Sequence, residues 1–132
     1  MLFRSTKYSP WPSFSSKEID IVSEVLSSNR VNYWTGDKGK NFEKKFSKWC
    51  GAQYGVAITN GTLALELALR ALGVGPGDEV IIPPRTFMAT ASAVSIIGAT
   101  PIFADIDPVS QNISPKSIAE NITKRTKAVI CV

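Results

Sequence analysis

In the second half of the chain, apolar β-branched segments alternate with turns and helix-like segments. This alternation limits the possible folds more than any other feature of the sequence. The predicted strands and helices are residues 54–59 (strand), 63–72 (helix, ended by Gly73), 79–83 (strand), 86–97 (helix, ended by Gly98), 101–105 (strand), a short helix with Ser114 as its N-cap and Pro115 as its first residue, and 127–132 (strand). Strands that alternate with helices form a parallel sheet with right-handed crossovers and helices on both faces. We therefore expect an α/β fold, a three-layer sandwich based on a parallel sheet.

Two further helices are predicted before this region. Ser15 and Glu18 have the spacing of a capping box, so a helix is expected to start there and to reach about Asn29. A second helix carries aromatic residues on one face and ends at Gly51, a suitable left-handed cap. We expect residues 1–30 to form an amino-terminal arm and helix. Residues 31–132 are expected to form an incomplete domain, because nothing follows the last predicted strand to complete the sheet.

Composition excludes several classes of chemistry. The 132 residues include no histidine, which removes the commonest general base and the usual ligand of transition metals. Cys50 and Cys131 lie far apart and are expected to be reduced and buried. No apolar run has the length of a membrane span or the pattern of a signal peptide, so we expect a cytoplasmic protein without a membrane partner.

The formal net charge of +4 raises the question of a polyanionic partner. The basic residues form two clusters, at positions 38–48 and 116–127, and each cluster is interrupted by a glutamate. Neither cluster alternates arginine with aromatic residues as nucleic-acid modules do. We interpret them as solvated helix faces and expect no nucleic-acid partner.

The turn from Thr59 to Thr62 is the best candidate for a ligand site. Ligands of open α/β sheets bind at the carboxyl ends of strands, where helices begin. Gly61 permits close approach of a ligand, Thr62 supplies a hydroxyl, and the first amides of the helix face outward with its positive dipole end. This pattern predicts a phosphate cradle. The alternative is that Asn60 or Thr62 only caps a buried helix.

Phe87 lies in the next turn from a strand to a helix, which should open at the same edge of the sheet. It could stack on a planar ring, or it could be an ordinary core residue. Asp105 and Asp107 end the third strand of this series, where turn chemistry is commoner than metal binding, so no metal site is predicted. The glycines from Gly73 to Gly77 precede a strand, whereas those of a dinucleotide-binding loop follow one.

Several motifs together, in this order, resemble the DegT/StrS family of sugar-nucleotide aminotransferases. They are Trp34-Thr35-Gly36, Phe42-Glu43, residues 60–65, residues 75–81 with Pro83, residues 86–90 and residues 98–101. The resemblance implies part of the large domain of a fold-type-I, aspartate aminotransferase-like enzyme. It also implies pyridoxal phosphate as the cofactor, a homodimer, and transfer of an amino group from an amino acid to a nucleotide-linked keto sugar.

The resemblance also implies roles for single residues. Asn60, Gly61 and Thr62 would bind the cofactor phosphate and Phe87 would stack on its ring, while Thr35 and Gly36 match a segment near the substrate. Family members are about three times longer and carry the lysine that binds the cofactor beyond this region. Because Lys127 starts a strand, at the wrong edge, we expect an inactive amino-terminal fragment with no catalytic residue of its own. A fragment of a sugar dehydratase and a non-catalytic phosphate-ligand or protein-interaction module are the alternatives.

Overall fold

The computed structural model describes residues 10–132, which form two compact units. The first unit ends at Ala57 and the second runs from Ile58 to Val132. The division of the sequence after residue 30 stays a prediction. We describe the two units separately.

The first unit contains helices α1 (Ser16–Ser27) and α2 (Lys38–Trp49). The predicted capping box is confirmed: the Ser15 amide donates to the Glu18 carboxylate at 2.7 Å, and the Glu18 amide donates to Ser15 Oγ at 3.3 Å. Gly51, after α2, has the predicted left-handed backbone with φ of 67°. Local sequence signals therefore mark the start of α1 and the end of α2.

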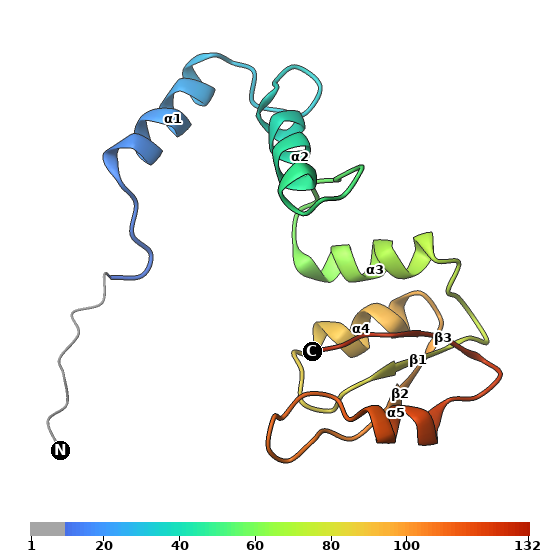
Figure 1. Ribbon diagram of the computed structural model, residues 1–132. Coiled ribbons are helices and arrows are strands. Elements are labelled where there is room, and N and C mark those ends of the chain that lie inside the picture. The colour runs from blue at the N-terminus through green and yellow to red at the C-terminus, as the bar shows by residue number, and fades with distance from the viewer. Residues whose placement is uncertain (1–9) are drawn as a thin grey trace, which may run out of the picture. The chain divides into compact units, whose positions relative to one another are not determined.

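The second unit contains three helices and a three-stranded parallel sheet (Figure 1). Its elements are α3 (Gly61–Ala71), β1 (Glu79–Ile82), α4 (Ala89–Ile96), β2 (Thr100–Phe103), α5 (Pro115–Asn121) and β3 (Thr126–Val129). The strand order is β2-β1-β3, so β1 is the central strand, and all four of its residues are buried. The predicted α/β class and parallel sheet are confirmed.

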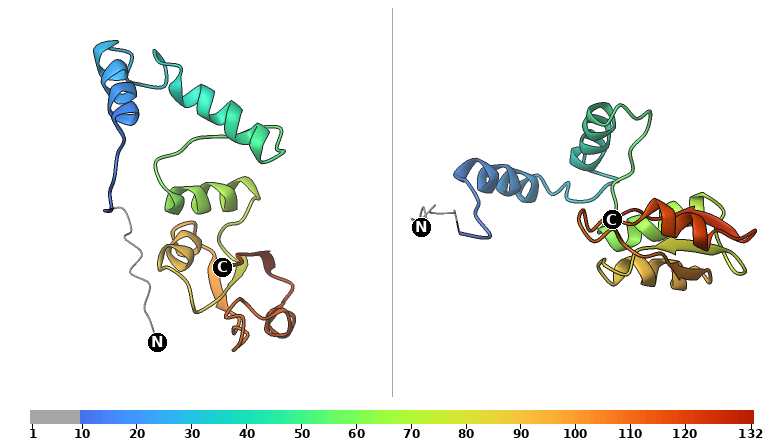
Figure 2. Two further views of the ribbon diagram at one scale, coloured as in Figure 1. Left: turned by 60° about the vertical axis from the view of Figure 1, so that its left-hand side comes forward. Right: turned by 60° about the horizontal axis from the view of Figure 1, so that its bottom comes forward.

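The side chains of β1 divide the core into two layers. Val80 and Ile82 pack with residues of α3 and α4, among them Leu69 and Val94. Ile81 points to the opposite face, where it packs with residues that include Ile113 and, in α5, Ile118. Figures 1 and 2 show α4 and α5 on opposite sides of the sheet. The alternation of strand side chains thus produces the expected three layers.

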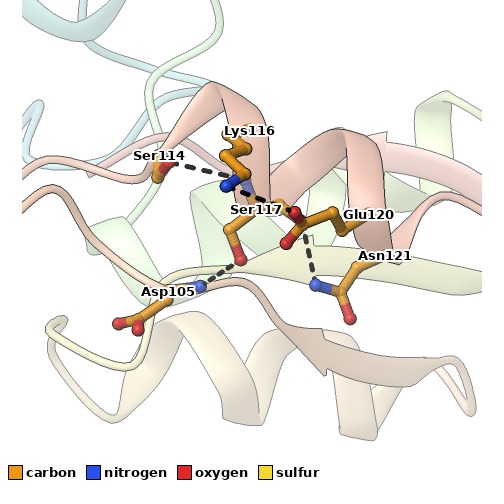
Figure 3. Close-up of polar contacts among 6 residues, drawn as sticks. All are labelled: Asp105, Ser114, Lys116, Ser117, Glu120 and Asn121. Carbon is orange, nitrogen blue, oxygen red and sulfur yellow. Dashed lines mark hydrogen bonds and ion pairs between the residues drawn. The ribbon is translucent and has the colours of Figure 1, made fainter.

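Polar contacts attach α5 to the end of β2 (Figure 3). Ser114 caps α5 by accepting a hydrogen bond from the Ser117 amide at 3.4 Å, as predicted, and Pro115 is the first helical residue. The Asp105 amide donates to Ser117 Oγ at 2.8 Å, and Asn121 donates to the Ser117 carbonyl at 2.8 Å. In Figure 3 the Asp105 carboxylate points away from Ser117.

The predicted strand at residues 54–59 is wrong. The segment has no strand partner among residues 10–132, and Tyr54 and Val56 are exposed. Apolar β-branched residues favour a strand only where a neighbouring strand accepts their backbone hydrogen bonds. The segment is therefore a connection to α3 without regular secondary structure, and most of its residues are exposed.

Three smaller expectations also need correction. Helix α4 starts at Ala89 instead of Thr86, because residues 83–88, which begin with two prolines, form a bend before the helix. Only one residue of α3, Leu69, is buried, so this predicted core helix has one packed face and one exposed face. Cys50 and Cys131 are free, as expected, but both are exposed.

Candidate functional site

The helices α3 and α4 start at the same end of the second unit. In Figure 1 both helices begin at the side of the sheet where the carboxyl end of β3 lies. The two helices pack against each other, and Leu69 of α3 and Val94 of α4 belong to one core cluster. The structure therefore places the Asn60–Thr62 turn and the bend at residues 83–88 at one end of the same helix pair.

Asn60 is the N-cap of α3. Its backbone is extended, its side-chain Oδ1 accepts from the Leu63 amide at 3.0 Å, and its carbonyl accepts from the Ala64 amide at 3.1 Å. Asn60 therefore has the capping role that the alternative describes. The amides of Gly61 and Thr62 donate to no other residue in the described part of the chain. These two donors lie at the positive end of the helix dipole and remain available to an anion.

Gly61 leaves open space at this helix end. A Cβ atom built on Gly61 would meet no other atom within 4 Å, and the residue does not have the positive φ that favours glycine. The fold of the second unit therefore does not require a glycine here. The absence of a side chain instead leaves the two amides accessible, as a phosphate cradle needs.

Phe87 is exposed over 78 % of its surface. Phe87 is therefore not part of the core that residues 10–132 form. The bend that carries it is held to α4 by a 2.7 Å hydrogen bond between the hydroxyls of Thr86 and Thr90. An anion-accepting helix end and an accessible aromatic face at one end of a helix pair suit a phosphorylated aromatic ring. The residues present therefore fit pyridoxal phosphate.

Thr35 and Gly36 belong to the first unit, where they form a tight turn with Asn32. The Asn32 side chain accepts from the Trp34 and Thr35 amides, each at 3.0 Å, and the Gly36 amide donates to the Asn32 carbonyl at 2.8 Å. A Cβ atom on Gly36 would lie 2.6 Å from the Arg30 carbonyl oxygen. This turn requires glycine for steric reasons.

The same turn borders a polar cavity of about 430 Å³. Arg30, Thr35, Gly36 and Lys38 line it together with residues from the end of α1. Sequence reasoning proposed Thr35 and Gly36 as site residues but did not single out Arg30 and Lys38, which line the same cavity. The only signal for them was their position on either side of the Thr35-Gly36 motif, and charge alone did not distinguish them from solvated side chains.

Asp105 and Asp107 have the turn chemistry that the sequence predicts. Asp107 Oδ1 accepts from the Ser110 amide at 2.7 Å and from the Val109 amide at 3.0 Å. These hydrogen bonds, first that of Ser110, lower the pKa of the Asp107 carboxyl below its usual value. Residues 10–132 contain no group of three side chains placed to bind a metal ion. None of their helices has the length and apolar character needed to cross a membrane.

Comparison with known proteins identifies relatives over most of the chain. The model of the DegT/DnrJ/EryC1/StrS aminotransferase family matches residues 12–132. GDP-perosamine synthase of Escherichia coli O157:H7 is 44% identical over 131 residues, which cover 96% of this chain and 35% of that protein.

Solved structures agree with this result. An aminotransferase from Psychrobacter cryohalolentis is 54% identical with a TM-score of 0.91, and the match covers 94% of this chain and 31% of that one. The PLP form of a putative sugar aminotransferase, Spr1654 of Streptococcus pneumoniae, is 36% identical with a TM-score of 0.84. That match covers 89% of this chain and 30% of the other. The chain therefore spans about a third of the length of these relatives.

Proposed function

Because the chain belongs to the DegT/DnrJ/EryC1/StrS aminotransferase family, we propose that it is the amino-terminal, cofactor-phosphate-binding part of a sugar aminotransferase. The whole enzyme transfers an amino group from an amino acid to a nucleotide-linked keto sugar, in the synthesis of cell-surface polysaccharides or deoxysugars. It works in the cytoplasm as a homodimer. The names of the relatives and the helix end at Gly61 support this proposal.

Different residues of the second unit bind different parts of pyridoxal phosphate. The amides of Gly61 and Thr62 and the Thr62 hydroxyl bind the phosphate, while Asn60 fixes the first turn of α3. The exposed ring of Phe87 packs on the pyridine ring. When bound, the cofactor supplies the electron sink that amino-group transfer needs. Thr35 and Gly36 contact the sugar substrate.

Residues 1–132 alone bind the cofactor without catalysing transfer. The reaction needs a lysine beside the cofactor, and Lys127 is the second residue of β3, near the amino end of the strand. The helix ends that bind ligands lie at the carboxyl ends of the strands. Lys127 therefore cannot reach the cofactor from its place in the sheet.

Gly61→Ala tests the observation that carries this proposal. The added methyl group enters open space in the protein, so the free energy of unfolding stays the same or rises. The same methyl group blocks the amides, so the Kd for pyridoxal phosphate rises at least tenfold, which corresponds to about 1.4 kcal/mol. Ligand titration by fluorescence and urea unfolding measure the two effects.

Gly75→Ala is the matched control. A Cβ atom there also meets nothing within 4 Å, and Gly75 lies in the turn before β1, at the amino end of that strand. Its affinity for pyridoxal phosphate should equal that of the original chain. If Gly61→Ala bound pyridoxal phosphate as tightly as the original chain does, the phosphate cradle would be contradicted. Turnover of an amino donor by the original chain would contradict the proposed inactivity.

A further inference from the structure

Glu43 connects two segments of the first unit that are separate in the sequence. It lies near the middle of α2 and is partly buried. Its Oε2 accepts a hydrogen bond from the Tyr33 hydroxyl at 3.0 Å, and its Oε1 accepts one from the Ala57 amide at 2.8 Å. Each oxygen of a single carboxylate thus holds a different segment against the same helix.

Tyr33 attaches the turn that carries Thr35 and Gly36. Close packing reinforces this contact, because a Cβ atom on Gly39, in the first turn of α2, would lie 3.2 Å from the Tyr33 ring. Lys40 Nζ lies 5.3 Å from the centre of the same ring. The Tyr33 side chain therefore contacts three residues of α2, while 48% of Tyr33 stays exposed.

The second segment, residues 52–57, packs just as closely on α2. The Ala52 amide donates to the Ser47 carbonyl at 2.9 Å, and a Cβ atom on Gly55 would lie 2.9 Å from the Glu43 carbonyl oxygen. Ala57, at the end of this segment, precedes Asn60 by three positions. Glu43 therefore fixes the chain just before it enters the turn that we assign to the cofactor.

We propose that Glu43 is a positioning residue that couples the turn at Thr35-Gly36 to the segment that enters the phosphate cradle. The inference rests on the proposed function, because that function assigns the sugar substrate to the Thr35-Gly36 turn and the cofactor phosphate to the turn that follows Ala57. A carboxylate shared by two donors transmits displacement of one donor to the other. Ordering of the Thr35-Gly36 turn by a substrate thereby also orders the segment that leads to Asn60.

Hydrogen exchange of the whole chain without ligand tests the coupling. Glu43→Ala should speed exchange of the Ala57 amide about tenfold, because this amide loses a charged acceptor. Tyr33→Phe removes only the hydroxyl, yet it should also speed exchange at Ala57, about threefold. The Asn41 amide, which donates to the Asp37 carbonyl, should exchange at its original rate in both variants.

An unchanged rate at Ala57 in Tyr33→Phe would overturn the proposal, because the two contacts would then be independent. Glu43→Gln keeps one carbonyl acceptor and should restore much of the protection that Glu43→Ala loses. Glu120→Gln makes the same chemical change in α5, where the carboxylate is exposed, and should leave every rate unchanged. If the exchange rate of the Asn41 amide rose as much as that of the Ala57 amide, the variants would be generally destabilised, and this result would also overturn the coupling.

Binding of pyridoxal phosphate gives a second readout. Glu43→Ala should raise the Kd about threefold or more, although Glu43 lies in the first unit, and an unchanged Kd would overturn transmission to the cradle. A chain that binds no pyridoxal phosphate at all would contradict the proposed function. The exchange rates of Tyr33→Phe would still decide the coupling in that case, so the two failures are distinguishable.

Discussion

The Tyr33 phenol donates to a carboxylate, and its titration should report that contact. The hydrogen bond to Glu43 raises the pKa of Tyr33 above the ordinary value of 10.0, and the negative charge of Glu43 acts in the same direction. Lys40, above the ring, favours the phenolate and opposes this shift. The contact therefore stabilises the first unit fully below pH 10.0 and is lost as the pH rises through the raised pKa.

Glu43→Gln should lower the pKa of Tyr33 toward the ordinary value, because the amide has no charge to repel the phenolate. Phenolate absorbance across an alkaline titration measures the change, with Tyr54→Phe used to remove the signal of another exposed tyrosine. A titration curve identical to that of the original chain would mean that the Tyr33–Glu43 contact does not form in solution.

Single residues whose signals are local could be predicted from the sequence. Ser15 and Ser114 cap their helices as predicted, and Gly73 and Gly98 have the positive φ expected after helix ends. In each case the cause is a hydrogen bond or a backbone angle within a few residues. Glu43 gave no such signal, because its partners lie 10 and 14 positions away.

At the scale of elements, a buried charge joins the amino ends of β1 and β3. The Glu79 side chain is only 4% exposed, and its Oε1 lies 2.6 Å from Arg125 Nη2. The Thr123 hydroxyl donates to the other carboxylate oxygen. The strand register shifts between Glu79 and Val80, so these contacts hold the two strands where the regular ladder is interrupted.

Arg125→Ala should destabilise the second unit by about 1–3 kcal/mol, because it leaves a buried carboxylate with fewer partners. We expect a smaller loss of stability than for a fully buried ion pair, because the Arg125 side chain is 69% exposed. Urea unfolding followed by circular dichroism measures the change. Lys124→Ala, a neighbouring exposed cation, is the control, and an equal effect of both variants would show that the ion pair contributes nothing specific.

Helices and strands could be predicted where neighbouring residues determine them. The prediction failed where an element depends on partners that are distant in the sequence. All five helices were expected in order; α1, α3 and α5 start at capping side chains that the sequence contains, whereas α2 and α4 have no side-chain cap. The apolar segment at residues 54–59 has the composition of a strand, but its state depends on whether another strand lies beside it. Composition cannot supply this information, which explains the wrong prediction.

At the scale of the whole molecule, the two units differ in how much apolar surface they bury. In residues 10–57 the only buried side chain belongs to Ser47, and Ile19, Val22 and Leu26 of α1 are exposed. The second unit buries β1 completely between helices. The apolar periodicity of α1 does not say whether a partner covers that face.

This difference predicts that the same substitution has unequal effects in the two units. Ile82→Val removes one methylene group from a fully buried site and should lower the free energy of unfolding by about 0.5–1.5 kcal/mol. Ile19→Val makes the same change at a residue that is 57% exposed, and the effect should stay within about 0.5 kcal/mol. Urea unfolding of both variants under identical conditions gives the comparison. Equal losses would mean that the apolar face of α1 is packed in solution, which would contradict the difference in burial between the two sites.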